Sequence, residues 1–154
     1  MGKKTWNQKL LTAGDYPKIE PIDERMQARL GVGLMVIPAP FEVDELMRGV
    51  PKGKLITTDL IRRKLAQKHG ADTACPLCTG IFVKIAAFAS EERAEAAAGE
   101  ETPYWRTLKT KGELVDKFPD AYDKQKLFLE REGFTVIQKG KKYFVRDYEK
   151  YLIE

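Results

Sequence analysis

The chain has 154 residues, of which 43% are hydrophobic and 10% aromatic, so it can bury the core of one ordinary domain. No apolar run approaches the roughly 18 residues of a membrane span, so we expect a cytoplasmic protein with no membrane partner. The net charge is +4, with basic segments at residues 48–70 and 138–146 and an acidic one at 91–101. This separation predicts a polarised surface that favours an anionic partner on one face, and solvated helix faces are the alternative.

Residues 1–37 are expected to form an N-terminal extension that packs on a main domain spanning residues 38–154. Within the extension, the pattern predicts a short helix over residues 23–30, ended by Gly31. The apolar run at 34–37 reads as a strand or a buried connector, and residues 41–47 as a short helix.

Two helices joined by a short loop are predicted next, and together they make a helix-turn-helix candidate. The first spans about residues 59–69, with threonines 57 and 58 as N-cap candidates and Gly70 as its end. The second follows a loop at 71–75. Its core-facing row is expected to contain Ile81, Ile85, Phe88 and Ala89, which are spaced i, i+4, i+7, i+8.

The C-terminal part begins with an aromatic and basic loop, Pro103-Tyr104-Trp105-Arg106. A helix is predicted over about 120–132, with Ala121, Phe128 and Leu129 turned inward. Two β-rich runs at 134–137 and 142–147 then flank a Lys-Gly turn and predict a β-hairpin. The expected fold is α+β and mainly helical, a winged helix-turn-helix with a C-terminal hairpin wing.

The two cysteines, Cys75 and Cys78, form a single C-x-x-C. Because two more ligands would be needed for zinc and no strand precedes the pair, we expect buried, small apolar side chains. A thiol-redox pair and a metal site are the alternatives. We expect neither a metal nor a cofactor.

Three motifs in order resemble the DNA-binding half of the alkylguanine-DNA alkyltransferases. Residues 50–57, Val-Pro-Lys-Gly-Lys-Leu-Ile-Thr, are similar to the P-x-G-x-V-x-T entry to the family's helix-turn-helix. Residues 103–106, Pro-Tyr-Trp-Arg, are similar to its P-C-H-R active-site loop. Residues 112–133 resemble the segment that ends in L-L-x-x-E-G.

The resemblance implies that the family's chemistry is lost in this chain. Alkyl transfer needs a thiolate nucleophile activated through a histidine and a glutamate. Tyr104 stands at the cysteine position and Trp105 at the histidine position, so only Glu132 of that relay remains. We therefore expect no catalytic residue, as in the alkyltransferase-like proteins, which mark alkylated guanines for repair factors.

By the same resemblance, a base pocket is expected from Tyr104, Trp105, Arg106 and Leu77. Leu77 falls about where the family has its base-flipping arginine, and Thr58 about where it has a phosphate-rotating tyrosine. Leu77 can wedge a base step as an apolar side chain, but it supplies no hydrogen bonds to the base left behind. The plainer alternative makes Tyr104 and Trp105 core plugs, with Arg106 holding its loop through Asp116 or Glu132.

Phosphate contacts are expected from basic residues on the first helix of the pair and on the hairpin, and the partner is expected to be double-stranded DNA. The predicted residues are Arg62, Arg63, Lys64, Lys139, Lys141 and Lys142. Lys84 is the only charged residue between positions 79 and 89, so binding should follow shape and backbone rather than sequence. We expect a monomer that also contacts a repair protein. The alternatives are a general DNA-binding winged helix and a protein-interaction module that has lost DNA binding.

Overall fold

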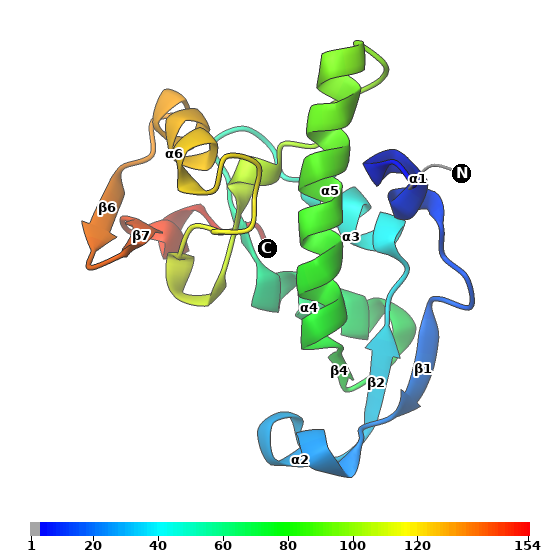
Figure 1. Ribbon diagram of the computed structural model, residues 1–154. Helices are drawn as coiled ribbons and strands as arrows, with labels where there is room; N and C mark the ends of the chain where they lie inside the picture. The colour runs from blue at the N-terminus through cyan, green and yellow to red at the C-terminus, as the bar shows by residue number, and fades with distance from the viewer. Residues whose placement is uncertain (1–3) are drawn as a thin grey trace.

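The computed structural model describes residues 4–154 and shows an α+β fold in which helices predominate (Figure 1). The helices are α1 Trp6–Leu11, α2 Glu24–Leu30, α3 Pro40–Arg48, α4 Thr58–His69, α5 Pro76–Ala96 and α6 Tyr122–Arg131. Single 3-10 turns occur at Tyr104–Arg106, Thr110–Gly112 and Tyr148–Tyr151. The helices predicted from the sequence are therefore confirmed to within a few residues, and the helix predicted after the loop at 71–75 extends to Ala96.

Short strands form three small sheets within this part of the chain. The strands are β1 Lys18–Pro21, β2 Leu34–Ile37, β3 Ile56–Thr57, β4 Thr73–Ala74, β5 Thr107–Leu108, β6 Val136–Lys139 and β7 Lys142–Val145. β2 pairs antiparallel with β1 and parallel with β4, so the N-terminal hairpin is joined to the loop between α4 and α5. β3 pairs parallel with β5, and β6 with β7 makes the predicted C-terminal hairpin.

Local capping explains why α4 and α5 begin and end where they do. The Thr57 side chain accepts a hydrogen bond from the Leu60 amide at the start of α4, and Gly70 ends that helix in a left-handed conformation with φ of 66°. Cys75 is the N-cap of α5, and Pro76 takes the first helical position, where no amide hydrogen is needed.

The main core surrounds α5, which runs through the centre of the molecule (Figure 1). α1 lies along the second half of α5, where Trp6 stacks on Phe88 with ring centroids 4.7 Å apart. Glu92 accepts hydrogen bonds from the Trp6 and Asn7 amides, which are unpaired donors in the first turn of α1. A chain segment from the N-terminus thus completes the packing of this helix.

The predicted inward row of α5 is only partly right. Ile81 is 47% exposed, whereas the residues buried on this helix are mostly small ones: Thr79, Val83, Ala86, Ala87, Ala89 and Ser90. The ring stacking and the hydrogen bonds from α1 fall on residues 88–93, about two turns beyond Ile81, which therefore stays half-exposed. Ala121 is likewise exposed, because it precedes α6 with a positive φ of 51°.

Within residues 4–154, the structure contains no helix with the length and apolar character needed to cross a bilayer.

Candidate functional site

The aromatic-basic loop enters the core through Tyr104, whose side chain is fully buried. Its ring meets Trp105 and Phe118 edge-on, with centroids 5.5 and 5.1 Å away. Its hydroxyl donates a hydrogen bond to Glu91 at 3.1 Å. Burial, together with the negative charge of Glu91, raises the pKa of the Tyr104 hydroxyl far above its ordinary value. Tyr104 is therefore a neutral phenol that is enclosed by other rings.

Trp105, Arg106 and Glu132 form one hydrogen-bonded cluster. The Trp105 indole N–H donates to Glu132 Oε2 at 2.7 Å, and the Arg106 guanidinium donates to both carboxylate oxygens at 2.8 to 3.1 Å. Arg106 also donates to the Val50 carbonyl at 2.7 Å. The alternative pairing of Arg106 with Glu132 is thus confirmed, and this pair ties the loop to the end of α6.

Burial opposes ionisation of Glu132, but the hydrogen bonds from Arg106, Trp105 and the Gly53 amide together outweigh it. The pKa of Glu132 consequently lies below its ordinary value. The residue carries its negative charge within a nearly closed site, where its side chain is 8% exposed.

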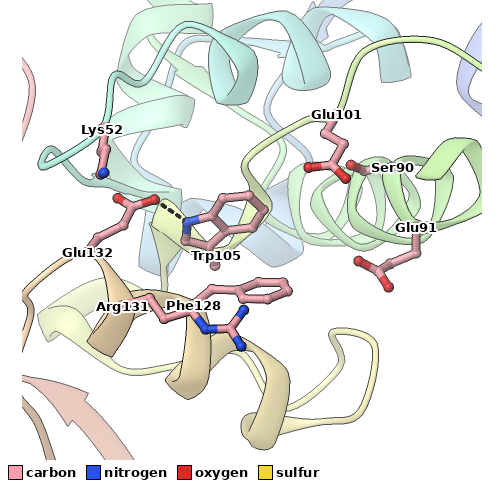
Figure 2. Close-up of a pocket in the computed structure, with 8 residues that line it drawn as sticks. All are labelled: Lys52, Ser90, Glu91, Glu101, Trp105, Phe128, Arg131 and Glu132. Atoms are coloured by element: carbon pink, nitrogen blue, oxygen red, sulfur yellow. Dashed lines mark hydrogen bonds between the residues drawn. The ribbon is translucent and has the colours of Figure 1, made fainter. Parts of the chain in front are cut away.

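A cavity of about 480 Å³ opens beside this cluster, between α6, the second half of α5 and the loop that joins α5 to Tyr104 (Figure 2). Its lining residues are Lys52, Ser90, Glu91, Glu101, Trp105, Phe128, Arg131 and Glu132. Trp105 and Phe128 lie in the middle, with centroids 4.8 Å apart, while Lys52 and Glu132 lie at one end and Ser90 and Glu101 at the other (Figure 2). The cavity is large enough for a small organic group or a side chain of another molecule.

The structure does not bring the four predicted base-pocket residues together. Of Tyr104, Trp105, Arg106 and Leu77, only Trp105 lines the cavity. Leu77 is 71% exposed in the first turn of α5, about 21 Å along the helix axis from Glu91.

The predicted phosphate-contacting residues on α4 differ in what they bind within the protein. Arg62 donates to the Ala74 carbonyl at 3.0 Å and to the Thr73 hydroxyl at 3.1 Å, so it holds the loop that leads to α5. Lys64 donates to the main-chain carbonyl of Glu154. Arg63 is exposed and forms no ion pair with any residue from 4 to 154.

On the hairpin, the three predicted lysines are all exposed. Lys142 lies 3.9 Å from Glu113, and the Lys139 amine lies 5.4 Å from the centroid of the Phe144 ring. Lys141 follows the turn at Gly140 and has no ion pair within the described part of the chain. Of the six, Arg63, Lys139 and Lys141 are therefore the residues that are exposed and make no side-chain hydrogen bond or ion pair within residues 4–154.

The two free cysteines differ in burial: Cys75 is buried, as expected, whereas Cys78 is only half-buried. Burial, with the hydrogen bond and charge of Cys75, raises the pKa of the Cys78 thiol to about 12. A raised pKa makes the Cys78 thiol a poor nucleophile, and β4 directly precedes the pair, where the sequence indicated no strand. No group of potential metal ligands gathers among residues 4–154.

Sequence reasoning missed most of the cavity. Phe128 was expected to face inward, and it does so in part. For Ser90, Glu91 and Glu101 the sequence indicated only a helix and an acidic segment, not a cavity. Their meeting depends on the length of α5 and on the path of residues 97–103, and neither has a local signal. Gln125, fully buried, bridges the Trp105 and Thr107 carbonyls and the Val115 amide without any sequence signal for that role.

No family model and no curated protein matches this sequence. Two solved structures share its fold. The first is the S. pombe ATL, or alkyltransferase-like protein, in complex with DNA. Its TM-score is 0.54 and its sequence identity 18%, and the match covers 75% of this chain and 94% of that chain. The second is S. pombe Atl1 in complex with damaged DNA containing O6-carboxymethylguanine, with a TM-score of 0.51 at the same identity and coverage. The fold of this chain is therefore similar to that of an alkyltransferase-like protein, as the motifs at 50–57, 103–106 and 112–133 predicted.

Proposed function

We propose that this protein is a non-enzymatic DNA-binding protein that recognises alkylated or otherwise modified bases in double-stranded DNA. The observation that carries the proposal is the shared fold, since the chain covers 94% of an S. pombe alkyltransferase-like protein whose structure contains DNA. The three motifs support it independently, because they occur in the order of the alkyltransferase family.

In this proposal, α4 and α5 act as the helix-turn-helix and the β6–β7 hairpin as the wing. Arg63, Lys139 and Lys141 contact phosphates. The first turns of α5 expose Leu77, Gly80 and Ile81, which cannot read base edges by hydrogen bonding. Binding therefore follows backbone position and DNA shape.

Base recognition is assigned to insertion of Leu77 at a base step. Unstacking costs a few kcal/mol and costs least at a damaged or mismatched base, so an inserted apolar side chain favours such sites. Tyr104 and Arg106 then position the loop rather than contact a base, because one is enclosed and the other is bound to Glu132.

The absence of enzymatic activity is assigned to the loop at 103–106. Tyr104 holds its proton, and the indole of Trp105 donates its only N–H to Glu132 and cannot act as a base. Alkyl transfer would require a nucleophile and a base at these two positions.

Fluorescence anisotropy with two labelled duplexes tests the proposal, one carrying an alkylated guanine and one unmodified, across a series of salt concentrations. We expect tighter binding to the alkylated duplex and affinities that fall steeply with salt. Equal, salt-sensitive binding would reduce the function to general DNA binding. Absence of binding to either duplex at low salt would refute it.

A second candidate function is a protein-interaction module that has kept the fold without DNA binding. It is favoured by the engagement of Arg62 and Lys64 within the protein, which leaves fewer cations for phosphates. A strong, salt-dependent DNA affinity would exclude this candidate.

A further inference from the structure

Both cysteines lie in the first turn of α5, directly after β4. Cys75 is the N-cap of the helix, Pro76 takes its first position and Cys78 its third. Helix geometry places Cα atoms three residues apart at a distance of about 5 Å. A disulfide joins Cα atoms that are roughly 4.4 to 6.8 Å apart. The start of α5 therefore holds the two thiols at a separation that a disulfide can bridge.

The two side chains interact while both cysteines are free. The Cys75 sulfur accepts a hydrogen bond from the Cys78 amide at 3.3 Å. Burial, and then the hydrogen bond and the charge of Cys75, raise the pKa of the Cys78 thiol to about 12. Hydrogen bonding acts only over a short distance, so the two thiol groups face each other rather than point apart.

The two cysteines differ in their access to solvent. Cys78 is half-buried, whereas Cys75 is only 6% exposed. Cys75 packs with Ile22 and Met35 in a small core, and its amide donates to the Val36 carbonyl at 2.9 Å. A dissolved oxidant therefore meets the Cys78 sulfur first, and Cys75 is placed to react with its neighbour.

Neither capping nor burial requires a thiol at these two positions. Helix N-caps favour side-chain oxygens, as Thr57 provides for α4, and the sulfur of Cys75 is a weaker acceptor. Cys78 is not fully enclosed, so a small apolar side chain is not demanded there either. What the pair offers beyond a cap and a core residue is its chemistry as two adjacent thiols.

We propose that Cys75 and Cys78 are a dithiol–disulfide site, which a low-molecular-weight disulfide such as glutathione disulfide oxidises reversibly. The ring closed by the new bond contains Pro76 and Leu77. Because a covalent ring removes conformations that its chain segment otherwise visits, the first turn of α5 opens less often in the oxidised protein. The site thus sets how rigidly the exposed Leu77 is held.

The reaction takes place in two exchange steps. The Cys78 thiol gives up its proton, its sulfur attacks one sulfur of glutathione disulfide, and one glutathione leaves and takes up a proton. The Cys75 sulfur then loses its proton and attacks the Cys78 sulfur, which forms the internal bond and releases the second glutathione. The protein loses two protons and two electrons, and the oxidant becomes two thiols. Since the Cys78 thiol holds its proton firmly, the first step is slow near neutral pH.

The full chain, equilibrated at a series of ratios of reduced to oxidised glutathione, tests the proposal. Remaining thiols are then blocked, and the intact mass is measured. We expect one step from a protein with two blocked thiols to a protein with none, lighter by two hydrogen atoms before blocking, and its reversal by dithiothreitol. A chain that stays reduced in oxidised glutathione alone would overturn the proposal, as would a stable glutathione adduct or a disulfide-linked dimer in its place.

Two serine variants separate the roles of the sulfurs. Cys75→Ser keeps a capping side chain at the helix start and leaves Cys78 without a resolving partner, so it should accumulate a glutathione adduct. Cys78→Ser leaves only the buried Cys75, and its adduct should form at least about tenfold more slowly. Equal rates of adduct formation would overturn the assignment of Cys78 as the sulfur that meets the oxidant.

The effect on DNA rests on the function proposed above, whereas the disulfide does not. If Leu77 is the inserted side chain, the oxidised protein should bind the alkylated duplex at least about threefold more tightly than the reduced protein, because its first turn is ordered in advance. Equal affinities would show that the disulfide does not act through Leu77. Binding of neither form to DNA would refute the DNA function and leave the dithiol site standing on the mass measurement.

Discussion

Glu132 joins three parts of the chain through one buried carboxylate. It accepts hydrogen bonds from Trp105, Arg106 and, at 3.4 Å, the Gly53 amide. Glu132→Gln removes the charge and leaves Arg106, whose side chain is 13% exposed, without its counter-ion. Because breaking a buried pair strands the remaining charge, we expect a loss of about 3 to 5 kcal/mol in the free energy of unfolding, measured with urea.

The matched control for this change is Glu130→Gln, two residues earlier on α6. Its carboxylate is 47% exposed and lies 3.9 Å from Lys126, so its removal should change stability by less than about 1 kcal/mol. Comparable losses in the two variants would show that the Glu132 cluster contributes no more than a surface pair.

Acid should destabilise the protein through the same residue and through Glu42. Both have a pKa below the ordinary value of 4.5, in each case because hydrogen bonds to the charged form outweigh burial. The unfolded chain therefore takes up protons at a higher pH than the folded one. The stabilisation is fully present above the unfolded value and is lost as pH falls through the lowered folded values. Urea midpoints from about pH 7 to about pH 3 should show this fall, and Glu132→Gln should make it shallower.

At the scale of single residues, the sequence indicated the loop at 103–106 but not the orientation of its side chains. Two aromatic residues after a proline fit both a buried plug and a stacking surface. The choice depends on Phe118 and Glu91, which enclose Tyr104 from distant segments. The sequence left Asp116 and Glu132 as alternative partners of Arg106, and the choice of Glu132 depends on the fold, in which Lys109 pairs with Asp116.

At the scale of elements, α1 should detach from α5 when Glu92, which binds the first-turn amides of α1, is lost. Glu92 accepts from the Trp6 and Asn7 amides and from the Asn7 side chain, at 2.9 to 3.1 Å. Glu92→Ala should therefore speed hydrogen exchange over residues 6–11 while leaving α4 protected. Glu95→Ala, one turn further along and unpaired within the described residues, is the control and should change neither.

The first turn of α5 carries the residue on which lesion recognition is proposed to depend. Leu77→Ala should change the free energy of unfolding by less than about 0.5 kcal/mol, because the side chain is 71% exposed. The same change should weaken binding to the alkylated duplex about tenfold, since an inserted wedge is lost. Leu11→Ala, at a leucine that is 74% exposed on α1, should not affect DNA binding. Unchanged affinity in Leu77→Ala would remove the insertion role.

Elements with strong local signals could be predicted, and those defined by long-range packing could not. α4 has an N-cap threonine and a terminal glycine, and the hairpin has a turn glycine between β-rich runs, so both were predictable. The buried face of α5 was not, because it is defined by packing against α1, α3 and α4, which come from earlier in the chain. Exposed Ile81 and buried Ala86 reverse what hydrophobicity alone predicts.

At the scale of the whole molecule, charge separates two surfaces. The exposed cations assigned to DNA lie on α4 and the β6–β7 hairpin, whereas the exposed carboxylates of Glu95, Glu100 and Glu101 lie at the end of α5 and in the loop after it. A net charge of only +4 conceals this arrangement, which gives the two regions opposite electrostatic character. The segmental distribution of charge in the sequence predicted this polarity, but not which of the cations were already bound.

The salt dependence of DNA binding should reveal how many of those cations contact phosphate. Each neutralised phosphate contributes about −0.9 to the slope of log affinity against log salt, so three contacts by Arg63, Lys139 and Lys141 predict a slope of about −3. Arg63→Ala and Lys141→Ala should each reduce the slope by about one and leave stability unchanged. Arg62→Ala should instead destabilise the protein, because Arg62 holds the Thr73–Ala74 strand through two hydrogen bonds. A slope that Arg63→Ala and Lys141→Ala leave unaltered would place the DNA on another face.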